Sequence, residues 1–272
     1  MNPTRLSNLL ILIAAGWALP LQAYDPLNRT EYLAKIKEAE AVYKEKCEKV
    51  AGIRIYKTVP DVEGVLLMKV RPARSDRELA DPNWPGAAFG REARGDEYIA
   101  SFLGSERRVR EKDGSLSPTR GHIGTDKRPG DLPGYRWVEV IDPKVGQRYR
   151  YAGRWEEPWL KDKSYLKGYI KFYLDKVPSP SPTPPRYAVT FEDHVIPEER
   201  ALWIASSTVK VLDLQTNDVL GEMTRYAMSY IHAPRQSMPW LNHYICPSQN
   251  MTGDLHGTRK FVDLILIPKR GE

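Results

Sequence analysis

The sequence predicts an α+β domain: an antiparallel β-sheet flanked by an N-terminal helix and a short C-terminal helix. Two observations predict this class. Between residues 30 and 50, apolar residues recur every three or four positions, which is the period of a helix with one buried face. From residue 186 onward, runs of β-branched and aromatic residues are separated by turn residues, which is typical of antiparallel strands.

The first residues have the layout of a secretory signal peptide. Arg5 precedes an apolar run over residues 6–21, and Ala23 supplies a small residue at the expected cleavage point. A retained N-terminal anchor is the alternative. We expect residues 1–23 to be removed and residues 24–272 to form a single extracytoplasmic, periplasmic domain with no transmembrane anchor.

The two cysteines of the chain are Cys47 and Cys246. An even number of cysteines in an exported protein predicts a disulfide. Cys47 falls on the apolar stripe of the first predicted helix, so the bond would tie that helix to the C-terminal segment. Two buried free thiols are the alternative.

The first helix is expected to begin after Asn28 or Thr30, which are good N-caps, and to end near Gly52. The ranges 53–59 and 62–70 are rich in β-branched residues and are separated by Pro-Asp. They are predicted to be two strands, with a hairpin as one possibility.

The range 72–134 is rich in Arg, Asp, Gly and Pro, and only 98–103 has apolar weight. We expect an irregular insertion with one short element. Because binding residues concentrate on loops, this insertion is also the expected binding surface.

The next third combines strands with an ambiguous segment. The ranges 135–141 and 148–151 alternate as strands do. The range 163–177 fits a helix or a strand, and the spacing of its tyrosines slightly favours a helix. The proline-rich range 178–185 is expected to be an extended connector.

The last third is the most regular part of the sequence. Strands are expected at 186–195, 202–214 and 219–230, with a tight turn at 215–218 whose Asn and Asp tolerate left-handed backbone. The range 258–266 resembles a short amphipathic helix.

No catalytic motif is present. The five histidines lack the spacing of a helical zinc pair, and there is no nucleophile elbow, phosphate-binding loop or dinucleotide pattern. The net charge of +6 is spread over many acids and bases, which does not indicate nucleic-acid binding. We therefore expect no catalytic residue, metal site or cofactor.

The chain is rich in aromatic residues, with seven Trp and fifteen Tyr. Tyr and Trp are enriched in protein interfaces. The candidate residues for binding another protein are those that fall in expected loops or in the insertion: Trp84, Phe89, Tyr98, Trp155 and Trp159.

The stretch CEKVAGIRIYKTV, beginning at Cys47, and VEGVLLMKVRP, beginning at Val62, resemble the start of small exported proteobacterial proteins. Some of these are similar to immunity proteins that guard against type VI secretion phospholipase effectors. The resemblance implies a periplasmic inhibitor that binds and blocks a toxin. Two alternatives remain: an envelope hydrolase acting on cell-wall or sugar polymers, and a structural envelope protein using its proline-rich segment as a spacer.

Overall fold

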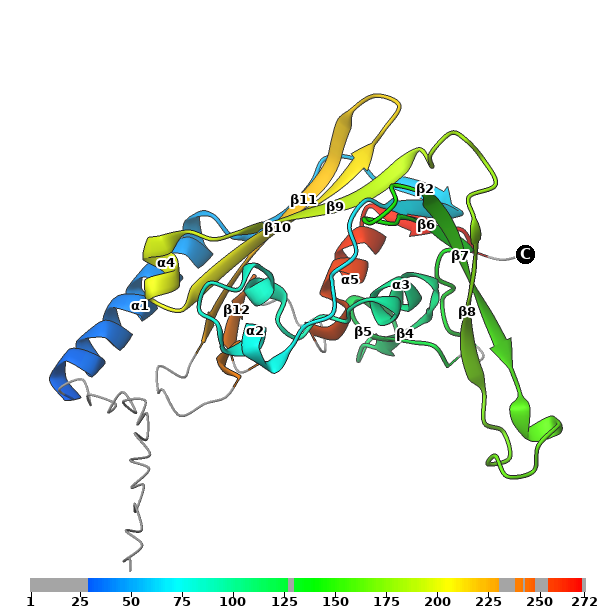
Figure 1. The fold of residues 1–272 in the computed structure, drawn as a ribbon, viewed down its shortest axis with the longest axis horizontal. Coiled ribbons are helices and arrows are strands. Elements are labelled where there is room, and N and C mark those ends of the chain that lie inside the picture. Colours follow the sequence, from blue (N-terminus) through cyan, green and yellow to red (C-terminus); the bar gives the residue numbers. More distant parts are fainter. Residues whose placement is uncertain (1–28, 127–129, 230–237, 242, 248–253, 271–272) are drawn as a thin grey trace, which may run out of the picture.

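The computed structural model describes residues 29–126, 130–229, 238–241, 243–247 and 254–270. The predicted signal peptide lies outside the described residues. The α+β class is confirmed: a large, mostly antiparallel sheet carries an N-terminal helix at one end and a short helix near the C-terminus (Figure 1).

The main sheet has nine strands in the order β1-β11-β10-β9-β3-β6-β7-β8, with β12 also paired to β11. These strands are β1 (Gly52–Ile55), β3 (Gly64–Leu67), β6 (Trp137–Ile141), β7 (Arg148–Glu156), β8 (Lys171–Pro178), β9 (Tyr187–His194), β10 (Ile204–Asp213), β11 (Asp218–Ser229) and β12 (His243–Cys246). Two small sheets pair β2 (Val59–Val62) with β13 (Leu266–Pro268), and β4 (Ser105–Arg110) with β5 (Leu116–Gly124).

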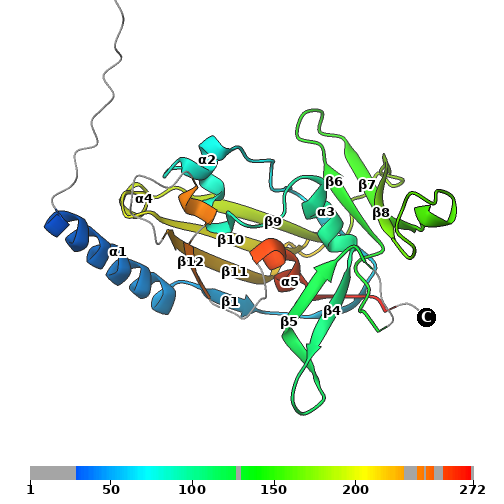
Figure 2. The ribbon, with the colours of Figure 1, turned by 90° about the horizontal axis from the view of Figure 1, so that it is seen from below.

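The described helices are α1 (Arg29–Lys49), α2 (Asp76–Ala80), α3 (Asp96–Leu103), α4 (Pro197–Ala201) and α5 (Gly257–Asp263), with 3-10 turns η1 (Pro85–Phe89), η2 (Pro158–Leu160), η3 (Pro239–Leu241) and η4 (Asp254–His256). Figure 2 shows α2, α3 and α5 lying over one face of the sheet. Between these helices and the sheet, one continuous core contains Phe89, Phe102, Trp240 and Phe261. None of the helices in the described part of the chain combines the length and the apolar character needed to cross a membrane.

The β9–β10–β11 meander forms where the sequence predicts it. Val209 of β10 pairs with Phe191 of β9 and Met223 of β11, and all three side chains are buried. The turn between β10 and β11 places Asn217 at a φ of 60°, a left-handed conformation that Asn tolerates.

β3 joins two antiparallel units. It runs parallel to β6 on one side and to β9 on the other, and its four residues are all buried. Strands covered on both faces are continuously apolar, which explains the sequence Gly-Val-Leu-Leu. The strands at 53–70 do not form a hairpin, which was one of the possibilities: β1 pairs with β11, β2 with β13, and β3 with β6 and β9.

The expected irregular insertion at 72–134 instead contains α2, η1, α3 and the β4–β5 hairpin. Each element is short and is stabilised locally. Ser75, for example, forms a capping box with Glu78 at the start of α2. Helices of one or two turns show too little of the 3.6-residue period to be detected.

The segment 163–177 is not a helix. Gly168 adopts a φ of 82°, and β8 begins at Lys171. The proline-rich range 178–185 connects β8 to β9, as expected. It is held in place by Arg148, whose guanidinium donates a 3.0 Å hydrogen bond to the carbonyl of Pro182. At the C-terminus, the expected helix at 258–266 ends at Asp263, and Leu266 begins β13.

α1 extends beyond the end of the sheet (Figure 1). Its C-terminal half packs against the sheet through Ala39, which is buried, and Tyr43, which is partly buried. Its N-terminal half is largely exposed, with Leu33 53% exposed. The predicted apolar stripe therefore contacts the protein mainly along its second half.

Candidate functional site

Three of the five predicted partner-binding residues belong to the core. Trp84, Phe89 and Tyr98 are 5%, 0% and 1% exposed. They are therefore not available to a partner, which corrects the expectation for these positions. The physical reason is that this part of the chain folds over the sheet and provides aromatic surfaces for buried arginines.

Arg71 is the centre of that buried region. Its guanidinium lies between the rings of Phe89 and Phe191, at 4.0 and 4.1 Å from their centroids. It forms an ion pair with Glu92 and a second, at 3.2 Å, with Asp193.

Glu92 links this pair to the C-terminal helix. Its carboxylate accepts hydrogen bonds from the backbone N–H of Thr258 (2.6 Å) and from the Thr258 hydroxyl (2.9 Å). Because Arg71 and Glu92 are both buried, the cluster joins β9, η1 and α5 rather than meeting a substrate.

The other two predicted residues, Trp155 and Trp159, lie on a projecting hairpin. We call β7, β8 and their connection the arm, and residues 157–170 the arm tip. Figure 1 shows the arm tip reaching beyond the rest of the molecule. Both tryptophans are partly exposed and lie on the same hairpin, whereas the other three predicted residues are buried in the core.

Trp155 anchors the base of the arm tip. Its ring packs edge-on against Phe172 at 4.9 Å between centroids, and its Nε1 donates a 2.6 Å hydrogen bond to the carbonyl of Thr125. Gly153 makes room for this packing, because a Cβ there would lie 2.5 Å from the Phe172 ring. Trp155 therefore sets the direction of the arm.

The arm tip exposes a group of apolar and aromatic side chains. Leu166 is 83% exposed, and the rings of Tyr165 and Tyr169 stack on each other at 5.7 Å. Leu160 and Ile170 are also exposed. Trp159 completes the group, with its Nε1 donating to Glu157 at 3.0 Å.

Lysines surround these side chains. The segment 157–171 contains four lysines and two acidic residues, so it is basic as well as apolar. Lys163 lies 5.5 Å from the Trp159 ring centroid and donates to the carbonyl of Trp159 at 3.1 Å. Sequence reasoning missed Tyr165, Leu166 and Tyr169 because their spacing suggested a helix. The turn-forming Gly168 was the signal that could have identified an exposed loop.

One hollow of the protein is lined by two histidines. It has a volume of about 370 Å³ and lies between α3, β5 and η4, with Glu97, His122, Asp126 and His256 in its wall. Burial, together with nearby His122 and Lys260, lowers the pKa of His256 to about 4. In the described ranges, no group of three or more His, Cys, Asp or Glu side chains is arranged to hold a metal ion.

This shift in pKa makes stability depend on pH. His256 stays neutral in the folded protein, whereas in the unfolded chain it takes up a proton below its ordinary pKa of 6.5. The contribution of His256 to the free energy of unfolding is therefore complete above about pH 6.5. It falls by about 2 kcal/mol as the pH decreases towards 4. The measurement is the urea midpoint at about pH 7 and about pH 4.5. His256→Gln should lose part of the pH dependence, and an unchanged dependence in that variant would refute the assignment.

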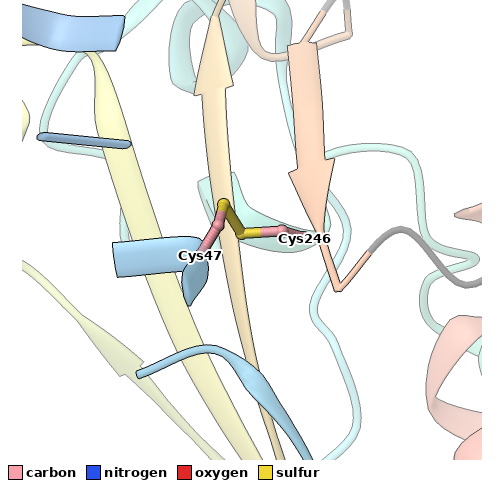
Figure 3. The surroundings of a disulfide bond; sticks show 2 residues. All are labelled: Cys47 and Cys246. Carbon is pink, nitrogen blue, oxygen red and sulfur yellow. A yellow bond between two sulfur atoms is a disulfide. The ribbon is translucent and has the colours of Figure 1, made fainter. Parts of the chain in front are cut away.

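The predicted disulfide is present. Cys47 in the last turn of α1 meets Cys246 at the end of β12, with an S–S distance of 1.96 Å (Figure 3). The bond joins residues 199 positions apart and fixes α1 to the edge of the main sheet.

Comparison of the chain with protein-family models, with curated proteins and with solved structures finds no match.

Proposed function

We propose that this chain is a periplasmic protein-binding module of the immunity type, which binds and neutralises a secreted toxin. The observation that carries the proposal is the arm tip: an exposed group of Trp, Tyr and Leu side chains at the end of a projecting hairpin. Exposed apolar groups of this kind mark interaction sites. Trp and Tyr provide most of the binding energy in many protein interfaces.

The shape of the arm favours a concave target. A projecting hairpin can insert into a cleft, and blocking a cleft is a direct way to inhibit an enzyme. The lysines around the arm tip favour an acidic rim on that target, because opposite charges steer association. The proposed partner is therefore a toxin with an apolar cleft bordered by acidic residues.

Affinity capture tests this proposal. The oxidised protein is the bait for lysate and secreted fractions of the source organism, and mass spectrometry identifies what is retained. Leu166→Asp places a charge at the most exposed apolar position of the arm tip. We expect it to weaken retention of the partner by about 30-fold, the cost of losing an interface hot spot.

Val145→Asp is the matched control. Val145 is 67% exposed, and it lies in the β6–β7 turn, at the opposite end of β7 from the arm tip. Retention should survive Val145→Asp and be weakened in Leu166→Asp. A partner that binds both variants equally would exclude the arm tip. Retention on peptidoglycan or glycans, with no protein partner, would favour the envelope hydrolase instead.

A further inference from the structure

A groove runs between α1 and α4, away from the arm. Its volume is about 850 Å³, which is the size of a binding site rather than of a packing defect. Its lining residues come from one face of α1 and from α4 with its flanks: Glu31, Ala34, Lys35, Glu38, Val42, Lys46, Ile196, Glu198, Glu199, Ala201 and Leu202.

The groove is open because of the residues that face it. Ala34 and Ala201 are too small to fill the space between the two helices, while Val42 and Leu202 give the groove an apolar lining. Ile196, another lining residue, is 37% exposed. These surfaces would lose water if an apolar side chain entered.

One ion pair holds the two sides of the groove together. Lys46 of α1 lies 2.8 Å from the carboxylate of Glu199 of α4. This contact and the neighbouring disulfide at Cys47 fix the C-terminal half of α1, so the groove is a stable feature of the fold.

The remaining charge of the groove is negative. Four glutamates and two lysines line it. Lys46 neutralises Glu199, which leaves Glu31, Glu38 and Glu198 facing a single lysine, Lys35. Among the described residues, these three glutamates form no ion pair with another part of the chain. A ligand for this groove must therefore be apolar and positively charged.

We propose that the groove binds a cationic amphipathic helix of a partner protein. Apolar side chains of that helix would contact Val42, Ile196 and Leu202, and its lysines or arginines would pair with Glu31, Glu38 and Glu198. This is the helix-in-groove mode of recognition, in which shape and apolar contact provide affinity and flanking charges provide orientation. The site shares no residue with the arm tip.

Fluorescence anisotropy tests the charge requirement. The probe is a labelled synthetic peptide with two copies of the heptad Leu-Lys-Lys-Leu-Leu-Lys-Leu, added to the oxidised protein. Wild-type protein should bind it saturably. Glu31→Gln with Glu38→Gln should weaken binding about fivefold, because each exposed ion pair contributes a fraction of a kcal/mol.

Glu40→Gln with Glu48→Gln is the matched control. It removes the same charge from the same helix, and neither residue lines the groove. Binding should stay within about twofold of wild type in this control. Equal weakening in both double variants would show that only the overall charge matters and would overturn the proposal. Absence of saturable binding to wild type would overturn it as well.

A steric pair of variants tests the position. Ala34→Tyr fills the groove and should weaken binding at least about tenfold, whereas Ala41→Tyr, on α1 but outside the groove lining, should not.

Sedimentation of the wild-type protein should show a monomer. Self-association lost in Ala34→Tyr would mean that a second copy occupies the groove, against the proposal. Leu166→Asp should leave peptide binding intact, so this inference and the arm-tip function can fail separately.

Discussion

Replacing Arg71 with alanine is expected to lower the free energy of unfolding by about 4 kcal/mol, a large part of the stability of a domain this size. The substitution would leave the carboxylates of Glu92 and Asp193 without their shared cation. It would also empty the space between the rings of Phe89 and Phe191. Removing one partner of a buried ion pair is costly because the other charge stays buried and uncompensated.

Urea unfolding followed by tryptophan fluorescence measures this loss. Arg136→Ala is the control, because Arg136 pairs with Glu63 at 3.0 Å where both side chains are exposed. Exposed pairs contribute less than about 1 kcal/mol, so this variant should unfold almost like wild type. Similar midpoints for Arg71→Ala and Arg136→Ala would show that the buried cluster does not stabilise the fold.

The second large effect concerns the disulfide. Replacing both Cys47 and Cys246 with serine removes a covalent link that closes a loop of 199 residues, worth about 5 kcal/mol in the chain-entropy model. The other contacts of α1 are modest: Ala39 is buried, Val42 and Tyr43 are partly buried beside it, and Lys46 pairs with Glu199. We therefore expect α1 to detach locally while the main sheet remains folded.

Hydrogen exchange with mass spectrometry distinguishes local from global opening. In the double serine variant, amides of α1 should exchange as in an unfolded peptide, while those of β10 and β11 keep their wild-type protection. Lys46→Met, which removes only the ion pair, should raise exchange in α1 slightly. Equal protection of α1 with and without the disulfide would contradict this prediction, as would simultaneous exposure of α1 and β10.

Several elements could be predicted because their signals are local. The period of α1, the alternation in β9, β10 and β11, and the Asn217 turn each depend on residues close together in the sequence. The disulfide was predictable because the chain has two cysteines and one falls on an apolar helix face.

The rest depends on contacts that the sequence does not display. β3 is an inner strand only because β6 and β9, far along the chain, align parallel to it. Trp84, Phe89 and Tyr98 fall in the range predicted as an irregular insertion, and their burial results from the way η1 and α3 fold over the sheet. Of the five predicted site residues, Trp159 is the one that lies at the arm tip. Its partial exposure could be predicted because exposure at the end of a hairpin depends on residues close together in the sequence.

The short strand β3 has a mechanical consequence. It connects the arm-bearing half of the sheet to the half that carries α1, yet its register with β9 covers two residue pairs, against four with β6 and eight between β9 and β10. A force applied at the arm tip reaches β9 either along the covalent connector 178–185 or through the backbone pairing of this narrow seam. Among the strand pairings that join the two halves, this one has the fewest residue pairs, so we expect the sheet to open first at Leu66 and Leu67 under tension while the connector keeps the halves linked.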